Sequence, residues 1–341
     1  MKRTFSVLLA LVMVIGLFAG MGSVKASADT EWPERSIDLI VFSAAGGGTD
    51  LVNRLLAAEM EKTLGQSIAV SNMPGASGGV ASTFVQAKDH NGYNLLGVSE
   101  GVFPLAVLNT APYTTKDYEY FIAGGTIALI SVAADSPYQT VQDVIDAMKA
   151  NPGKVKLANS QVGCIWDIKA ALFKQATGVE YQFMSYQGSN PSILACLNGE
   201  VDVIITGLGE QAEYLKAGKL RPLAVVETEG AEVPNYGFVE SITETVPELA
   251  DTISTVSQAV GFAIPSDTDP EIIAKLTDAF NEAMASEAMA QYAEEKYLTL
   301  TGLSGAEAKE LAESMESTFS WILYDAGIAP ISPEDYNIPR P

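Results

Sequence analysis

The stretch that decides the fold is Ser36–Arg54, SIDLIVFSAAGGGTDLVNR. Its first half alternates apolar residues as a β-strand does, and three glycines follow. A plausible cap at Thr49 or Asp50 predicts a helix in the second half, with an apolar stripe at Leu51, Val52, Leu55, Leu56 and Met60. A strand–glycine–helix turn directs free backbone N–H groups and the positive end of the helix dipole at whatever lies above it. The stretch therefore predicts an anion-binding site made without basic side chains.

This loop does not match the phosphate-binding motifs. A P-loop requires Gly-Lys-Ser/Thr, whereas Gly48 is followed by Thr49 and Asp50. A dinucleotide site requires a third glycine where Leu51 stands and an acidic residue about 20 residues later, near the end of the next strand at Asn72. Asp50 would also repel a pyrophosphate. The residues therefore favour a smaller carboxylate anion over a nucleotide.

Residues 1–28 have the pattern of a secretory signal peptide. Lys2 and Arg3 precede an apolar run at about 7–18, and Ala26-Ser27-Ala28 is typical of a cleavage site. The apolar run is shorter than the roughly 20 residues that a membrane span needs. We therefore expect a secreted, extracytoplasmic protein of the periplasm, made of residues 29–341.

Charge and composition exclude several kinds of partner. The net charge of −22 becomes −25 once the three positive charges of residues 1–28 are removed. A field of this sign repels nucleic acids and anionic membrane surfaces, so we expect neither as a partner. With 341 residues, 48% of them hydrophobic, the chain is large enough to build two cores.

The sequence contains no organised catalytic or metal-binding set. His90 is the sole histidine and lies in a predicted turn, so a Ser-His-Asp site lacks its base and a metal site lacks its ligands. We therefore expect no enzyme, no metal and no cofactor. Cys164 and Cys196 are the only cysteines, and in an oxidising compartment their even number slightly favours a disulfide over two buried thiols.

Strand and helix patterns alternate along most of the chain. Strands are predicted at 67–71, 93–99, 127–134, 155–158, 181–184, 201–206, 220–226 and 256–264. Residues 227–254 are irregular and acidic, and the remainder to about 326 is mostly amphipathic helix. Alternating strand–helix units predict an α/β fold with mostly parallel sheets covered on both faces. Ligands of such sheets bind at the carboxyl ends of the strands, where this chain has small-residue loops.

Short motifs are spread over nearly the whole mature chain. The most specific are the Gly-Gly-x-Thr-Asp loop at 46–50 and the Asn-x-Pro-Gly-Ala block at 72–76. Others are Trp32-Pro33, Leu64-Gly65-Gln66, Asn91-Gly92-Tyr93, Asn151-Pro152-Gly153-Lys154, Thr177-Gly178-Val179, Tyr186-Gln187-Gly188-Ser189, Asn198–Asp202 and Ala217–Val225. Together these motifs resemble the solute-binding receptors of tripartite tricarboxylate transporters, often called the Bug family.

The resemblance implies a fold and a function. The fold would be that of a type II-like periplasmic binding protein, a Venus flytrap with two lobes and two crossovers between them. Residues 29–127 with 255–341 would form the first lobe, and 128–254 the second. The function would be to capture a small mono-, di- or tricarboxylate between the lobes and to deliver it, as a monomer, to integral membrane permease subunits. A co-receptor that presents its ligand to a membrane sensor kinase is an alternative use of the same cleft.

The resemblance also implies site residues. One ligand carboxylate would be held mostly by backbone amides of two first-lobe loops, with Ala44, Ala45, Gly46, Gly47, Gly48, Thr49, Asp50, Ala76, Ser77 and Gly78 as the expected contacts. At other strand ends we expect Ser99, Ser160, Gln161, Trp166, Tyr186 and Thr206 to line the cleft.

Two of these positions have a second interpretation. Asp50 has equal reason to fix its own loop by accepting N–H groups. Trp166 and Tyr186 in the cleft would favour a ligand with a flat or apolar body. With Trp166 in the core instead, a small aliphatic dicarboxylate becomes the better candidate. The second lobe departs most from the family pattern, since its loop at 160–167 is SQVGCIWD where a Gly/Ser-rich loop followed by His-Leu is usual.

Overall fold

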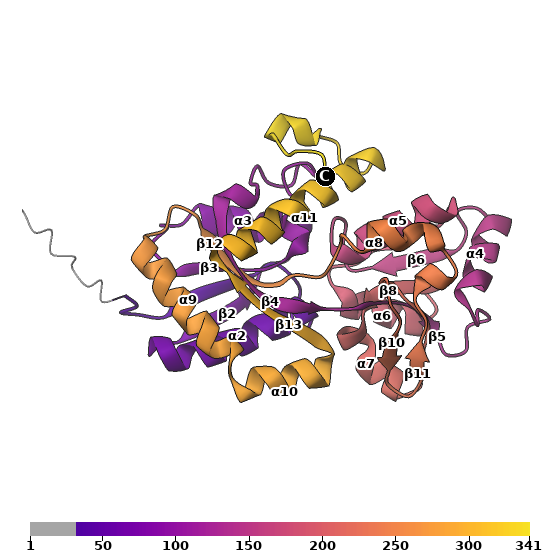
Figure 1. Ribbon diagram of the computed structural model, residues 1–341, viewed down its shortest axis with the longest axis horizontal. Helices are drawn as coiled ribbons and strands as arrows, with labels where there is room; N and C mark the ends of the chain where they lie inside the picture. The colour runs from indigo at the N-terminus through magenta and orange to yellow at the C-terminus, as the bar shows by residue number, and fades with distance from the viewer. Residues whose placement is uncertain (1–31) are drawn as a thin grey trace, which may run out of the picture. The chain divides into compact units, whose positions relative to one another are not determined.

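The structure is a computed structural model that describes residues 32–341, so the expected signal peptide at 1–28 lies outside the described residues. Residues 33–341 form one compact unit. Its strands make a six-stranded sheet, a five-stranded sheet and a small hairpin, with helices packed around the two larger sheets (Figure 1). Among helices of the described part, none combines the length and the apolar character that crossing a membrane requires.

The six-stranded sheet has the order β13-β4-β12-β3-β1-β2. Its strands are β1 (Ile37–Val41), β2 (Ile68–Asn72), β3 (Asn94–Ser99), β4 (Tyr118–Thr126), β12 (Val260–Pro265) and β13 (Leu298–Ser304). The helices with this sheet are α2 (Gly48–Leu64), α3 (Gly79–Gln86), α9 (Pro270–Met284), α10 (Glu287–Lys296) and α11 (Gly305–Asp325), together with the short turns η1 (Ala76–Gly78), η2 (Glu100–Val102), η3 (Thr115–Asp117) and η6 (Pro333–Tyr336).

The five-stranded sheet has the order β7-β6-β8-β5-β9. Its strands are β5 (Ala128–Ala133), β6 (Lys156–Asn159), β7 (Gln182–Ser185), β8 (Val203–Gly207) and β9 (Leu220–Val225). Between and after them come α4 (Val141–Ala150), α5 (Ile165–Thr177), α6 (Ser189–Leu197), α7 (Leu208–Lys216), α8 (Ala250–Ile253), η4 (Ile242–Glu244) and η5 (Pro247–Leu249). The hairpin pairs β10 (Ala231–Val233) with β11 (Gly237–Val239).

The predicted α/β class is confirmed, but the sheets are mixed rather than mostly parallel. The chain passes from the six-stranded sheet to the five-stranded sheet between β4 and β5, and it returns before β12. β5 runs antiparallel to β8 and β9, and β12 runs antiparallel to β3 and β4. The parallel pairs are confined to β1 with β2 and β3, and to β6 with β7 and β8. The strands next to the two passages therefore break the βα pattern.

Most of the predicted apolar stripe of α2 is buried, but the first residue of that stripe is not. Val52, Leu56 and Met60 are buried, whereas Leu51 is exposed. The helix begins at Gly48 with Gly47 as its N-cap, so the predicted cap at Thr49 or Asp50 is wrong by two or three residues. The first-turn N–H groups therefore start at Gly48, and the N-cap residue offers no side chain to accept them.

The two cysteines do not form a disulfide, which corrects the slight preference for one. Cys164 and Cys196 are both buried free thiols. Cys164 precedes α5 and packs in the large apolar cluster, while Cys196 lies in α6 and packs in a second cluster. Because each side chain fills a different core, the two sulfur atoms are not brought together.

Two glycines mark the place where β4, β12 and β13 lie closest. A Cβ atom on Gly124 would come 2.0 Å from the carbonyl oxygen of Thr299, and one on Gly261 would come 1.9 Å from that of Phe121. Real Cβ contacts are not this short, and the neighbouring atoms are backbone. At this point the strands therefore pack peptide group against peptide group.

Candidate functional site

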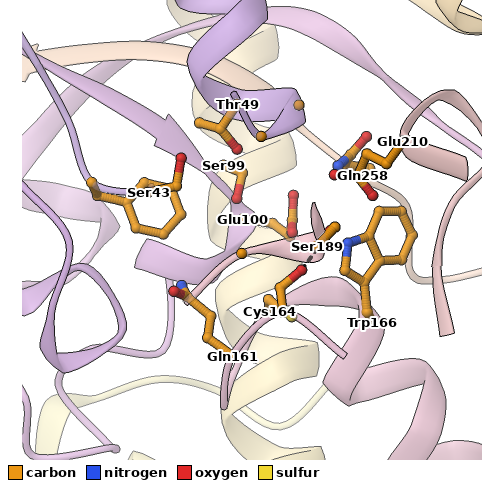
Figure 2. Close-up of a pocket in the computed structure, with 15 residues that line it drawn as sticks. Ser43, Thr49, Ser99, Glu100, Gln161, Cys164, Trp166, Ser189, Glu210 and Gln258 are labelled. Carbon is orange, nitrogen blue, oxygen red and sulfur yellow. Dashed lines mark hydrogen bonds between the residues drawn. The ribbon is translucent and has the colours of Figure 1, made fainter. Parts of the chain in front are cut away.

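A small cavity lies between strand ends of the two large sheets (Figure 2). Its volume is about 30 Å³, which is room for roughly two water molecules. The six-stranded part contributes Phe42, Ser43, Gly47, Gly48, Thr49, Ser99, Glu100 and Gln258, and the five-stranded part contributes Ser160, Gln161, Cys164, Trp166, Gly188, Ser189 and Glu210. The cavity is thus formed jointly by the loops that follow strands of both sheets.

The loop after β1 is held in shape by Asp50, which is 1% exposed. Its carboxylate accepts the Gly46 N–H at 2.8 Å, the Arg54 Nε–H at 3.0 Å and an amide hydrogen of Asn72 at 2.7 Å. Burial raises the pKa of Asp50, but the hydrogen bonds from Arg54, Gly46 and Asn72 outweigh burial and hold that pKa below its ordinary value. Asp50 therefore acts as the anchor of the loop rather than as part of the cavity wall.

The N-terminus of α2 faces the cavity and already holds a carboxylate. Glu210, the third residue of α7, accepts the N–H of Gly48, and it also bonds to the Gly207 N–H at 2.8 Å and to the Ser189 hydroxyl. A Cβ atom on Gly48 would lie 3.0 Å from Oε1 of Glu210, so this approach requires glycine or a shift of the glutamate. Burial raises the pKa of Glu210 to about 6.

A second glutamate makes the corresponding contact in the opposite direction, from the six-stranded part to a helix of the five-stranded part. Glu100, at the end of β3, accepts the N–H of Ile165 at 3.1 Å, and Ile165 is the first residue of α5. Its other oxygen accepts the N–H of Ala259 at 3.0 Å, next to β12. Glu100 is 1% exposed, and burial raises its pKa to about 7. Each sheet therefore supplies one glutamate to the N-terminus of a helix that belongs to the other sheet.

The cavity offers hydrogen-bond donors but no cationic side chain among its described lining residues. Nε2 of Gln161 and Oγ of Ser43 are buried and make no hydrogen bond within residues 32–341. Gln161 is only 5% exposed. Unsatisfied buried donors of this kind are rare, and they mark a place where a polar partner fits.

An outer pocket adjoins this cavity. Its volume is about 230 Å³, and Gly48, Glu210 and Gln258 line both spaces. The outer pocket also reaches Tyr292 and Lys296 on α10. A mostly apolar cavity of about 820 Å³ lies between α5, α8 and α11. Val162 and Asp167 of the loop at 160–167 line it, but no residue of the loops that follow β1 and β2 does.

The structure brings seven of the sixteen expected residues to the cavity. Gly47, Gly48, Thr49, Ser99, Ser160, Gln161 and Trp166 line it. Gly46 lines the outer pocket, and Ala44 lies near Gly188. Ala45 and Asp50 do not line the cavity, and neither do Ala76, Ser77, Gly78, Tyr186 or Thr206. Trp166 satisfies both interpretations, because it lines the cavity and is 2% exposed within the large core cluster.

The loop at 76–78 does not line the cavity but packs behind it, in an unusual backbone conformation. Ala76 and Ser77 have φ angles of 48° and 51°, in the left-handed region that few non-glycine residues adopt. A Cβ atom on Gly78 would meet Val102 at 3.0 Å and Phe42 at 3.1 Å. Phe42 is itself part of the cavity lining, so this loop supports the cavity from behind.

Sequence reasoning missed several lining residues. They are Phe42, Ser43, Glu100, Cys164, Gly188, Ser189, Glu210 and Gln258. Glu100 and Glu210 each lie directly after a strand end or strand-end loop that was singled out, so their positions carried a signal. Gln258 accepts the N–H of Thr126 at 2.8 Å and thereby joins the two passages between the sheets, which nothing in its sequence context indicates.

Because the pKa of Glu100 is raised in the folded chain, stability should depend on pH. A raised folded pKa contributes stability that is fully present below the unfolded value of 4.5 and is lost as pH rises through about 7. We therefore expect the melting temperature to fall between pH 5 and pH 8. In the Glu100→Gln variant this fall should be smaller, as measured by thermal unfolding at both pH values. An equal fall in the variant would contradict a titrating Glu100.

Comparison with known proteins places the chain in a family. The sequence model of the tripartite tricarboxylate transporter family receptor, TctC, matches residues 52–315. A UPF0065 protein of Cupriavidus necator is 34% identical over 276 residues, which cover 78% of this chain and 80% of that protein. Protein BugT of Bordetella pertussis is 32% identical over 298 residues, covering 82% and 86%.

Solved structures agree on the fold. The periplasmic binding protein BugD has a TM-score of 0.79 at 22% identity, covering 87% of this chain and 99% of BugD. A structure of an R. palustris protein with adipate has a TM-score of 0.79 at 27% identity, covering 88% and 100%. The chain therefore belongs to the TctC family of solute-binding receptors and has the two-lobed α/β fold of periplasmic binding proteins. This family consists of transporter receptors rather than enzymes, and the predicted family and fold are confirmed.

Proposed function

We propose that this chain is an extracytoplasmic receptor that captures a small carboxylate in the cavity between its sheets and delivers it to a tripartite tricarboxylate-type permease. One observation carries the proposal. The N-terminal turn of α2 faces the cavity at Gly48 and Thr49, and it accommodates a carboxylate there in the form of Glu210. Helix N-termini favour anions through free N–H groups and the helix dipole.

The other polar groups of the cavity support the same proposal. The unpartnered Nε2 of Gln161 and the hydroxyls of Ser43 and Ser99 are hydrogen-bond donors that suit ligand oxygens. A relative at 27% identity was solved with adipate. The proposed site residues are Gly47, Gly48, Thr49, Ser99, Ser160, Gln161 and Trp166.

The proposal extends to organisation and partners. Residues 29–127 with 255–341 form one lobe and 128–254 the other, so that the passages between β4 and β5 and before β12 serve as the crossovers. Residues 1–28 direct export to the periplasm and are removed. The receptor works as a monomer and docks on integral membrane permease subunits, and its strongly acidic surface keeps it from nucleic acids.

Calorimetry tests the proposed function. We expect at least one straight-chain mono- or dicarboxylate to bind at micromolar or tighter dissociation constants without added metal. A Thr49→Pro variant should bind that carboxylate about tenfold more weakly, because proline removes one N–H facing the cavity while remaining acceptable in the first helical turn. The melting temperature of the variant serves as the control for folding. Tight binding of a neutral sugar or a nucleotide, with every carboxylate inert, would refute the proposal.

A further inference from the structure

Glu210 holds the place in the cavity where a ligand carboxylate is expected. It lies on α7, yet it reaches across to the N–H of Gly48 at the start of α2. Its contacts with the Gly207 N–H and the Ser189 hydroxyl complete a set of three donors around one carboxylate. Ser189 in turn shares a hydrogen bond of 2.6 Å with Ser160, which links this glutamate to two further lining residues.

Glu210 also separates two spaces. Together with Gly48 and Gln258 it lines both the cavity of about 30 Å³ and the outer pocket of about 230 Å³. The inner cavity alone is far too small for a six-carbon acid, since it holds roughly two waters. A ligand whose carboxylate binds at Gly48 must therefore extend past the position that the Glu210 side chain occupies.

We infer that Glu210 determines the specificity of this site: its carboxylate holds the N-terminus of α2 in the empty protein, and a ligand carboxylate binds by taking its place. This inference rests on the proposed function. The displaced glutamate keeps the Gly207 N–H as a partner, because Gly207 is the N-cap of α7 and Glu210 accepts its N–H from the third position of the same helix. Glu210 thus competes with the ligand and then remains as its neighbour.

The charges around Glu210 determine which ligands it admits. The titratable groups that face it are Glu100 across the cavity, Cys164 in the lining, Glu213 and Tyr214 on α7, and Tyr292 and Lys296 on α10. The negative charge of Glu210 raises the pKa of Glu100, and Lys296 lies only in the outer pocket. A ligand with one negative charge adds that charge to a space that already holds Glu100 and Glu210. A dianion of the same length adds a second negative charge to the outer pocket, where Glu210 and Glu213 outnumber the single cation Lys296. We therefore expect a monocarboxylate to bind more tightly than the dicarboxylate of equal length.

Binding should also take up protons. The pKa of Glu210 is about 6 in the empty protein. The arrival of a ligand carboxylate removes the Gly48 donor and adds a negative neighbour, and both changes raise that pKa further. Between the two pKa values the liganded protein binds more protons than the empty one, so affinity should fall as pH rises from 5.5 to 7.5.

Hexanoate and adipate are suitable probes, because they share six carbons and differ by one carboxylate. At pH 7.5 the Glu210→Ala and Glu210→Gln variants should each bind hexanoate about tenfold more tightly than the unaltered chain, since the competitor is lost. At pH 5.5, where Glu210 is largely protonated, this advantage should shrink. Calorimetry at both pH values measures the affinity, and Glu200→Gln, which alters an exposed acid that lines neither the cavity nor the outer pocket, is the matched control.

A readout without ligand guards against a variant that fails to fold. In ¹⁵N NMR spectra of the unaltered, empty protein, the amide of Gly48 should titrate with a midpoint near the pKa of Glu210, about 6. The same titration should persist in Glu200→Gln and vanish in Glu210→Gln, which keeps a capping residue at that position.

The outcomes separate the two proposals. Weaker or unchanged hexanoate binding by both Glu210 variants would overturn the role of Glu210 and leave the proposed function intact. Adipate binding more tightly than hexanoate to the unaltered chain at pH 7.5 would also count against that role. If no carboxylate binds the unaltered chain or either Glu210 variant, the proposed function fails and this inference fails with it.

Discussion

Replacing Asp50 with alanine should lower the free energy of unfolding by about 3 kcal/mol, because a buried charge network loses its central acceptor. The carboxylate of Asp50 accepts hydrogen bonds from Gly46, Arg54 and Asn72, and the side chain is almost fully buried. Alanine leaves these donors without the partner that shapes the glycine loop. Because the same loop positions the first turn of α2, carboxylate binding should fall by about a hundredfold or more.

Chemical denaturation and calorimetry at pH 7 measure both effects. Asp38→Ala is a matched control, since Asp38 is an exposed acid on β1, just before the same loop. The depressed pKa of Asp50 gives the sign of the pH dependence: its contribution is present above the unfolded value of 3.8 and is lost as pH falls through the lower folded value. The stability difference between the two proteins should therefore be full at pH 7 and shrink in acid. Near-normal stability with undiminished binding would mean that the loop keeps its shape without Asp50.

Placing alanine at Gly209 should weaken carboxylate binding by about tenfold to a hundredfold, because the added methyl group disrupts the contact between α7 and α10. A Cβ atom on Gly209 would lie 2.2 Å from the carbonyl oxygen of Lys296, the last residue of α10. That oxygen is backbone and cannot rotate away. The helices must then separate, which moves the loops of the five-stranded part away from the start of α2, where the ligand carboxylate is proposed to bind.

Small-angle scattering should show a larger radius of gyration for Gly209→Ala than for the unaltered chain when both are mixed with the carboxylate that binds. Stability should change little, since alanine is a better helix former than glycine. Glu213→Ala, on the same helix, tests whether a substitution on α7 is itself harmful. If affinity and scattering profile both match those of the unaltered chain, the contact between α7 and α10 has no part in closure.

The local sequence pattern was enough to predict the part of the site that the turn between β1 and α2 provides. The alternation of β1, the glycines and the stripe of α2 all lie within residues 36–60, so the turn and its free N–H groups follow from sequence period and helix geometry. Even there the pattern erred on the cap. Asp50 has the chemistry of an N-cap, but its carboxylate is drawn instead to Gly46, Arg54 and Asn72.

The part of the site that the two buried glutamates provide depends on contacts between residues far apart in the sequence. Glu210 meets Gly48, and Glu100 meets Ile165, only because the two sheets come together. In the sequence alone, nothing distinguishes either glutamate from the other acidic residues, of which the chain has 42 in all. Burial of these two, and hence their raised pKa values, is a property of the tertiary structure.

The sequence did not predict the strands β4 and β13, and the reason is related. β4 carries two glycines near its end, and β13 is a short run of alternating residues between two helices. Both pair antiparallel within the six-stranded sheet, so neither shows the strand–helix spacing that predicted the others. Tertiary pairing overrides local propensity at such positions.

The glycine contacts between β4, β12 and β13 bear on how this receptor can diversify. A side chain at Gly124 or Gly261 would clash with the backbone of a neighbouring strand, so both positions require glycine. They fix the joint beside the passages, by which we mean the place where β4, β12 and β13 meet. The proposed ligand contacts lie in loops such as 160–167, which are separate from that joint. We therefore expect changes of cargo in such receptors to arise from substitutions in these loops, with the joint left as it is.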